Sequence, residues 1–170
     1  MEIADQMHAL RGSAMTELSA GCLREAVTAA DSQFSRLVLL VGGRSAGKTT
    51  ALKSLSAQID TRVVNLNLEL SGKLLELTPK QRSLKTSEYF AELCGSDENV
   101  LLLDNLELVF DSELKQDPLR LLLANARSHT IVAVWPGRYL DGILTYAEPG
   151  HPEYRRYDSV DALIVNMERK

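Results

Sequence analysis

The residues best suited to chemistry form one short segment with the spacing G-x-x-x-x-G-K-T, which runs from Gly42 to Thr49. Glycines at its two ends let the backbone turn successive amide N–H groups toward one point, where they can hold an anion. A helix that begins here directs the positive end of its dipole at the same anion. The spacing therefore predicts a phosphate-binding loop, in which Lys48 contacts the β- and γ-phosphates of a nucleotide and Thr49 coordinates magnesium. The predicted nucleotide contacts are Gly42, Gly43, Arg44, Ser45, Ala46, Gly47, Lys48, Thr49 and Thr50.

A second segment, Asn99–Asp104, is an apolar run that ends in a carboxylate. An aspartate at the carboxyl end of a neighbouring strand can hold magnesium through a bound water. Asp104 is therefore the second predicted magnesium ligand beside Thr49, and a strand-end turn or helix cap is the alternative. Hydrolysis also needs a group that orients the attacking water, but Asn105 stands where many P-loop ATPases have glutamate. Side chains alternate along an extended chain, so Glu107 is the candidate if the strand continues, and a surface carboxylate is the alternative.

Arginines near the end of the chain complete the candidate catalytic set. In AAA-type ATPases, an arginine followed by an aromatic residue and an aspartate supplies a finger across a subunit boundary. Arg156-Tyr157-Asp158 resembles this pattern, and Arg155 precedes it. Such a finger neutralises charge that develops in the transition state, an effect of roughly 10³–10⁵ in rate. Arg155 or Arg156 is the predicted finger, with Arg127 and Arg138 in reserve and a surface ion pair as the alternative.

The segments around these residues predict alternating strands and helices. Apolar runs typical of strands buried in a parallel sheet are Leu37–Val41, Arg62–Leu66, Val100–Leu103, Thr130–Trp135 and Ala162–Val165. Helices are predicted at 47–58, from the Thr78–Gln81 capping box to Cys94, and from Pro118 onward. Residues 136–158 are rich in Pro, Gly and Tyr and are expected to form loops around at most a short helix.

Strands that alternate with helices indicate βαβ units with right-handed crossovers. We therefore expect an α/β fold, a three-layer P-loop NTPase domain at residues 35–170 with a mostly parallel five-stranded sheet in the order 5-1-4-3-2. The strand at 130–135 is expected between the two strands that carry the loop and Asp104, and it ends without a polar sensor residue. Residues 1–34 are expected to form a helical segment packed on this domain, or a partner-binding helix. No helical lid domain fits after residue 165, so a lid would come from a partner or from residues 1–34.

Composition narrows the class of protein. Of the 170 residues, 45% are hydrophobic and 25% charged, which is typical of a globular domain and not of a disordered chain. The net charge of −4 does not favour DNA as a partner, although a local basic patch keeps DNA contact open. The longest apolar run, Leu37–Val41, is too short to cross a bilayer, and no secretion signal is evident. We therefore expect a cytoplasmic protein with no membrane attachment and with free thiols at Cys22 and Cys94.

Four segments together resemble the BrxF family, the small P-loop proteins of type III bacteriophage-exclusion (BREX) defence systems. They are the phosphate-binding loop with its strand, Leu-Leu-Leu-Asp-Asn-Leu-Glu, Ala-Val-Trp-Pro-Gly, and Leu-Thr-Tyr-Ala-Glu-Pro-Gly-His-Pro-Glu-Tyr, within residues 37–165. The last two are far more particular than the loop, which countless proteins share. The resemblance implies an intracellular ATPase in a multi-gene antiviral island, working beside a large AAA-type ATPase, a DNA methyltransferase and a phosphatase-like protein.

These observations favour a Mg²⁺-dependent ATPase that converts ATP and water to ADP and phosphate, slowly alone and faster when assembled with itself or with other BREX proteins. A nucleotide-gated scaffold that binds proteins or DNA without hydrolysis is the first alternative, because Asn105 replaces the usual glutamate. A small-molecule kinase of the nucleoside or shikimate type is the second, because such enzymes have this size and also begin with a phosphate-binding loop. The sequence leaves the choice between ATP and GTP open.

Overall fold

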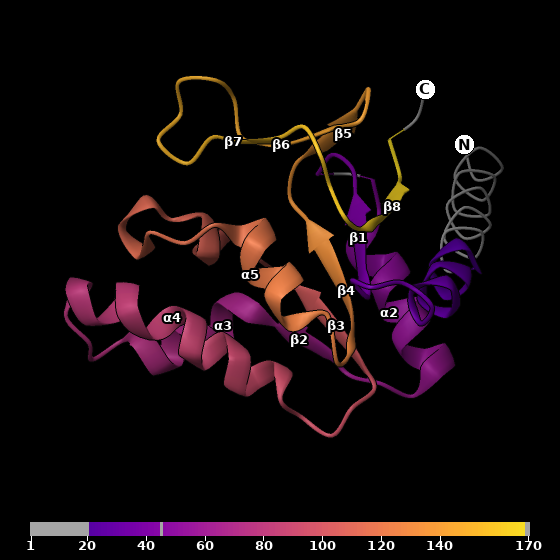
Figure 1. Cartoon of the computed structure of the whole chain (residues 1–170), viewed down its shortest axis with the longest axis horizontal. Coiled ribbons are helices and arrows are strands. Elements are labelled where there is room, and N and C mark those ends of the chain that lie inside the picture. Colours follow the sequence, from indigo (N-terminus) through magenta and orange to yellow (C-terminus); the bar gives the residue numbers. More distant parts are fainter. Residues whose placement is uncertain (1–20, 45, 169–170) are drawn as a thin grey trace, which may run out of the picture.

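A computed structural model describes residues 21–44 and 46–168. Five strands form a parallel sheet at its centre (Figure 1). They are β1 (Leu37–Val41), β2 (Val63–Asn65), β3 (Val100–Asp104), β4 (Thr130–Trp135) and β8 (Leu163–Asn166). Their spatial order is β2-β3-β4-β1-β8, and each neighbouring pair is parallel. The predicted α/β class with a five-stranded parallel sheet is confirmed, as is the place of β4 between β1 and β3.

The observed strand order differs from the predicted 5-1-4-3-2 only in the number of the strand at the edge beside β1, which is the predicted last strand but not the fifth along the chain. That strand is the eighth along the chain, because three further strands separate it from β4. They are β5 (Arg138–Leu140), β6 (Ile143–Tyr146) and β7 (Arg155–Tyr157), which form a second, antiparallel sheet in the order β5-β6-β7. The prediction of loops at 136–158 is therefore wrong. These strands are only three or four residues long and mostly half-buried or exposed, so they lack the apolar run that marks a buried strand.

Helices cover both faces of the parallel sheet (Figure 1). One face packs on α2 (Lys48–Ile59) and on the helical residues 21–30. The other packs on α3 (Leu66–Leu74), α4 (Pro79–Cys94) and α5 (Pro118–Asn125). The side chains of β1 alternate between the two resulting apolar clusters, which gives the three layers. This packing fixes the end of β1, where the predicted phosphate-binding loop begins.

Helix α3 was not predicted, because its sequence pattern is typical of a strand. Residues 65–70 read Asn-Leu-Asn-Leu-Glu-Leu, an alternation of polar and apolar residues that is typical of a strand. In the structure the strand ends at Asn65, whose side chain accepts a hydrogen bond of 3.1 Å from the N–H of Leu68 and caps the helix. Leu66, Leu70 and Leu74 are then buried on one helix face. The predicted capping box at Thr78 is confirmed for α4, and α5 begins at the predicted Pro118 with Asp117 as its cap.

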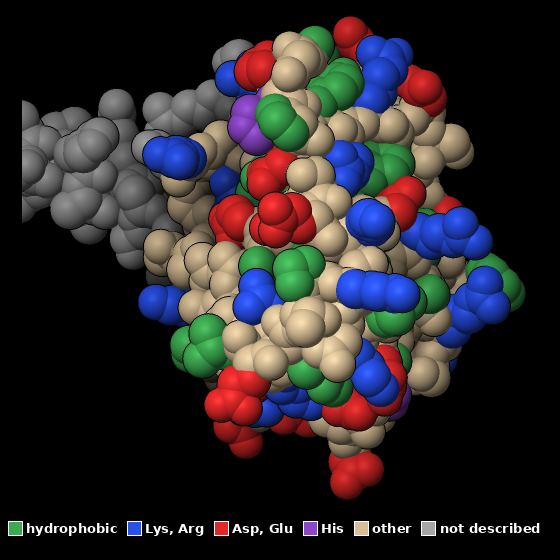
Figure 2. All heavy atoms as spheres, turned by 90° about the vertical axis from the view of Figure 1, so that its left-hand side faces the viewer, with side chains coloured by type: hydrophobic (Ala, Val, Ile, Leu, Met, Phe, Trp, Pro, Cys, Tyr) green, Lys and Arg blue, Asp and Glu red, His purple; other side chains and the backbone are tan. Residues whose placement is uncertain are grey.

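The predicted N-terminal helical segment is described only in part. Residues 21–30 are helical, and Leu23 and Ala30 are buried in the apolar cluster on the α2 face. Residues 1–20 of that prediction lie outside the described residues. Among the described helices, none combines the length and the apolar character needed to cross a membrane. On the side of the molecule seen in Figure 2, both positive and negative side chains lie at the surface.

Candidate functional site

The loop between β1 and α2 lies at the carboxyl end of the parallel sheet, and its geometry requires glycine at two positions. Gly47 has a φ of +80°, in the left-handed region that favours glycine. A Cβ at Gly42 would lie 2.9 Å from the Cβ of Ala46, closer than real side chains approach. Within the described chain, no side chain caps α2 and no acidic residue occupies its first turn. Its first N–H groups can therefore bind an anion without competition.

Lys48 is held against this loop. Its exposed fraction is 9%, and its Nζ donates hydrogen bonds to the carbonyl oxygens of Gly42 and Gly43, the second at 2.7 Å. Burial lowers the pKa of Lys48 below its ordinary value, and nearby carboxylates, Asp104 foremost, oppose that shift. A phosphate on the loop would give the partly desolvated ammonium group the counter-charge that it lacks.

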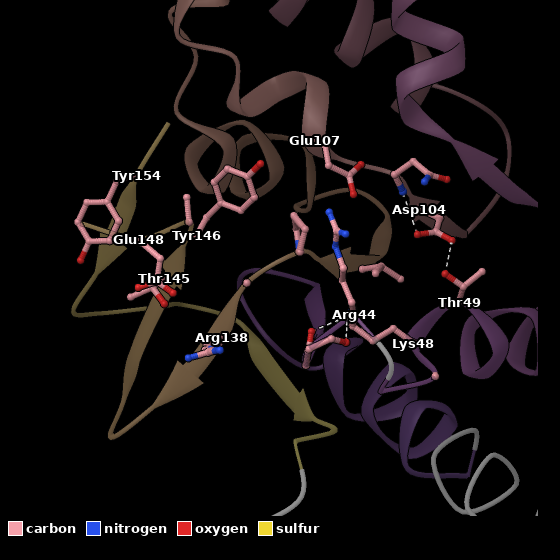
Figure 3. A pocket seen from close by; sticks show the side chains of 18 of the residues that line it. Arg44, Lys48, Thr49, Asp104, Glu107, Arg138, Thr145, Tyr146, Glu148 and Tyr154 are labelled. Atoms are coloured by element: carbon pink, nitrogen blue, oxygen red, sulfur yellow. Dashed lines mark hydrogen bonds between the residues drawn. The ribbon is translucent and has the colours of Figure 1, made fainter. Parts of the chain in front are cut away.

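Thr49 and Asp104, the two predicted magnesium ligands, are in direct contact. Thr49 Oγ1 donates a hydrogen bond of 2.9 Å to Asp104 Oδ2 (Figure 3). The second carboxylate oxygen accepts a bond of 2.9 Å from the N–H of Asn105. A hydroxyl and a carboxylate are the hard oxygen donors that Mg²⁺ prefers, and the ion usually takes its other ligands from water and phosphate. Among the described residues, no three His, Cys, Asp or Glu side chains are placed so that they could hold a metal ion together.

Glu107 reaches the same site by a route that the sequence did not predict. β3 ends at Asp104, Asn105 has a left-handed φ of +55°, and Glu107 begins a short 3₁₀ helix, η1 (Glu107–Phe110). The prediction of a continued strand is therefore wrong, because the chain turns at Asn105. Glu107 nevertheless lines the pocket that the loop lines.

Asn67, in the first turn of α3, holds this turn in place. Its N–H donates to the carbonyl of Asn105 at 3.0 Å, and its Nδ2 donates to Glu107 Oε2 at 3.2 Å. Its Oδ1 accepts a hydrogen bond of 2.8 Å from the N–H of Leu108. Asn67 is a site residue that the sequence reading missed. Its only sequence signal is a polar side chain just after a strand that lies beside β3.

The loop, Thr49, Asp104 and Glu107 line a pocket of about 820 Å³. One wall is the loop with the carboxyl end of β3. The other wall comes from the small antiparallel sheet and the segment that leads into it (Figure 3). Its residues are Val134, Pro136, Gly137, Arg138, Thr145, Tyr146, Ala147, Glu148, Pro149 and Tyr154. The sequence analysis used these residues only for the family resemblance, so it did not predict that they line the pocket. These residues form a wall of the pocket, and a lid from a partner or from residues 1–34 stays a prediction.

The small sheet is fastened to the core mainly through Trp135, the last residue of β4. Trp135 is fully buried, and its Nε1 donates a hydrogen bond of 2.9 Å to the carbonyl of Thr145 on β6. Its ring meets those of Phe110 and Tyr157 edge-on, with ring centroids 5.0 and 5.8 Å apart. Phe110 also contacts the ring of Tyr146, at 3.8 Å between centroids. We call Phe110, Trp135, Tyr146 and Tyr157 the aromatic cluster.

Two further contacts fix the small sheet. A Cβ at Gly137 would overlap the carbonyl group of Thr145 and would lie 2.8 Å from the indole nitrogen of Trp135, so only glycine fits. The hydroxyl of Tyr157 donates a hydrogen bond of 2.9 Å to Asp117 Oδ1, at the start of α5. Burial, then the charge of Asp117, raises the pKa of Tyr157, so this phenol stays a donor throughout the neutral range.

Seven of the nine predicted nucleotide contacts line the pocket: Gly42, Gly43, Arg44, Gly47, Lys48, Thr49 and Thr50. Ala46 does not, and its N–H closes a turn on the carbonyl of Gly43 at 3.1 Å. Ser45 lies outside the described residues.

The structure does not bring Arg155 and Arg156 to the pocket of their own chain. Both lie on β7, where Arg156 pairs with Asp158 at 2.8 Å and Arg155 donates to the carbonyl of Tyr154. The Arg156 pair is the surface ion pair named as the alternative, and a role across a subunit boundary stays a prediction. Of the reserve arginines, Arg138 lines the pocket, whereas Arg127 lies over the ring of Phe34.

A comparison with models of known protein families found none that matches this chain, and a search of curated proteins found no match. The fold and the site therefore carry the functional argument. Together they define an α/β protein in which one ammonium group, one hydroxyl–carboxylate pair and the open start of a helix converge on a single pocket.

Proposed function

We propose that this chain binds ATP with Mg²⁺ in the pocket and hydrolyses it to ADP and phosphate. The observation that carries the proposal is the convergence of the buried Lys48 ammonium with the Thr49–Asp104 pair at the uncapped start of α2. The proposal includes the P-loop NTPase fold. Counted within the parallel sheet alone, β8 is the fifth strand, so the order read from its edge becomes 5-1-4-3-2, which supports that fold.

In this proposal each side chain has one task. The N–H groups at the start of α2 hold phosphate oxygens, and Lys48 exchanges its contacts with loop carbonyls for β- and γ-phosphate oxygens. Thr49 and Asp104 hold Mg²⁺, directly and through water, and the ion when bound supplies neutralisation of charge on the β- and γ-phosphates. Glu107 orients the attacking water, with one carboxylate oxygen fixed by Asn67.

We further propose a role in BREX defence, in the cytoplasm, with self-assembly or the large AAA-type ATPase raising the rate. The support is the resemblance described above, whose two most particular segments span residues 133–137 and 144–154. Both contribute to the wall of the pocket opposite the loop. The residues that carry the resemblance therefore lie where they can shape a ligand site.

The test compares Lys48→Ala with Lys53→Ala, a control on the exposed side of the same helix. We expect Lys48→Ala to weaken ADP and ATP binding in the presence of Mg²⁺ by about 100-fold or more, measured by isothermal titration calorimetry, because a charge-assisted phosphate contact is lost. Lys53→Ala should bind as the wild type does. Equal affinities for all three proteins would refute the site.

Phosphate release separates hydrolysis from the two alternatives. We expect release from ATP without any added acceptor, at a rate per chain that rises with protein concentration or with partners. Tight ATP binding without release at any concentration would instead select the nucleotide-gated scaffold. The observation that favours the scaffold is the left-handed turn at Asn105, because it places Glu107 outside the strand that was predicted to position it. Release that requires a small-molecule acceptor would select the kinase.

A further inference from the structure

Arg44 is an arginine within the predicted phosphate-binding loop itself. It lines the pocket, and Figure 3 shows its side chain extending from the loop into the pocket in the direction of Glu107. The ion pairs found among the described residues all involve other side chains. The guanidinium group of Arg44 is thus available to a ligand that enters the pocket.

The place of the γ-phosphate follows from the magnesium ligands. Thr49 and Asp104 would hold the Mg²⁺ ion, which would neutralise charge on the terminal phosphates, so the γ-phosphate would lie on the Asp104 side of the loop. The attacking water then lies beyond it, toward Glu107. Arg44 extends into that same part of the pocket (Figure 3). Its planar set of N–H donors matches phosphate oxygens in a way that a lysine ammonium does not.

The charged residues that line the pocket also favour a contact between Arg44 and the γ-phosphate. Its lining holds three carboxylates, Asp104, Glu107 and Glu148, against three cations, Arg44, Lys48 and Arg138. Of these cations, Lys48 is already assigned to the β- and γ-phosphates in the proposed function, and Arg138 lies on β5 with its Nε 3.8 Å from Glu168. A triphosphate adds further negative charge, and the charge on the γ-phosphoryl oxygens must be neutralised during transfer. Arg44 is the pocket cation best placed to do this.

We infer that Arg44 is a catalytic residue that acts on the nucleotide bound by its own chain; this inference rests on the proposed function. In the step, the water oxygen forms a bond to the γ-phosphorus, and the bond from that phosphorus to the bridging oxygen breaks. The water proton passes to the Glu107 carboxylate, and ADP leaves with the bonding electron pair. Arg44 donates hydrogen bonds to the γ-phosphoryl oxygens throughout. The chain then carries its own arginine finger, independent of Arg155 and Arg156.

The first experiment measures phosphate release and ADP affinity for Arg44→Ala, Arg44→Lys and the exposed control Arg120→Ala. We expect Arg44→Ala to lower kcat on the order of 10³-fold, Arg44→Lys to recover only part of it, and the control to match the wild type. ADP affinity should stay within a few-fold, whereas affinity for the transition-state mimic ADP·AlF₄⁻ should fall by a factor like that of kcat. An unchanged kcat in Arg44→Ala, or a loss of ADP affinity as large as the loss of kcat, would overturn the inference.

The second experiment mixes Arg44→Ala with Lys48→Ala. The first variant keeps a site that binds nucleotide, and the second keeps the arginine but binds no nucleotide. Action within one chain predicts that mixing restores no activity at any ratio. Restored activity would show that the arginine acts on a neighbouring chain and would overturn the inference. If the wild type binds ADP but never releases phosphate, both the proposed hydrolysis and this inference are overturned. If the wild type hydrolyses ATP and Arg44→Ala does so with the same kcat, only the inference is overturned.

Discussion

The parallel sheet and the small antiparallel sheet form opposite walls of one pocket, but they are held in different ways. β1 and β4 are buried along their whole length, with helices packed on both faces. In the small sheet only Leu144 is fully buried, and the sheet depends on Trp135, Gly137 and Tyr157 for its place. The wall that carries the predicted phosphate-binding loop is therefore positioned by the whole core, and the facing wall is positioned by a few contacts. Mutations should separate phosphate binding from pocket shape.

The largest effect is expected for Trp135→Ala, which removes the centre of the aromatic cluster. Loss of a fully buried indole costs about 3–5 kcal/mol of unfolding free energy, and the Thr145 carbonyl loses its donor. Trp135→Phe should cost less, since a ring remains. Urea unfolding followed by circular dichroism measures both. A loss below about 1 kcal/mol for Trp135→Ala would mean that the small sheet does not depend on this residue.

Gly137→Ala and Gly72→Ala form a matched pair on the two regions. At Gly137 a methyl group overlaps the backbone of Thr145, so the small sheet must move, at a cost of about 1–3 kcal/mol. At Gly72, inside α3, a methyl group meets no atom within 4 Å and should stabilise the helix by about 0.5–1 kcal/mol. Thermal unfolding of both variants checks the opposite signs. We expect Gly137→Ala still to bind ADP, because the loop is unchanged. A complete loss of binding would show that the position of the loop depends on the small sheet.

Tyr157→Phe should have a smaller effect of the same kind. It removes the hydrogen bond to Asp117 but keeps the ring in the aromatic cluster, at a cost of about 1 kcal/mol. The raised pKa of Tyr157 gives a pH signature. The phenol donates at all pH values below its folded pKa, so the stability difference between wild type and variant should stay constant from pH 6 to pH 9. A difference that vanishes within that range would contradict the assigned donor.

The smallest expected effect of a mutation in the small sheet is on the alkylation rate of Cys94, which reports whether the core around this thiol opens. Burial raises the pKa of Cys94 to about 12, and only the thiolate reacts, so alkylation of Cys94 at pH 8 should lag far behind that of the exposed Cys22. Each unit of increase in pH should speed the Cys94 reaction about tenfold while the fold persists. We expect the same slow rate in Gly137→Ala, because Cys94 belongs to the core cluster of the parallel sheet. Mass spectrometry of alkylated peptides measures both rates. Fast labelling of Cys94 in Gly137→Ala would show that a change in the small sheet also opens the core of the parallel sheet.

The sequence predicted the parts of the fold whose stability is local or depends on burial. The strands at 37–41 and 130–135 were predicted with the observed bounds because continuous apolar runs need two covered faces. The position of the loop between a strand and a helix, and of Asp104 at the end of its strand, was also predicted from residue type and spacing, and their role in nucleotide binding stays a prediction. The small sheet was not, because its order comes from long-range contacts such as Trp135 with Thr145. Glu107 was identified as a candidate but by the wrong route, because a single left-handed residue, Asn105, ends the strand.

The order of strands has a mechanical consequence for the small sheet. β4 and β8 lie on either side of β1, and the intervening chain, which carries the small sheet, leaves from one and returns to the other. Because β8 is parallel to β1, this chain leaves the carboxyl end of β4 and must run back along the sheet to the amino end of β8, so the small sheet is joined to the core at both of its ends. A segment joined to the core at both ends has no free end, so we expect this wall of the pocket to shift only together with the parallel sheet that holds its two ends.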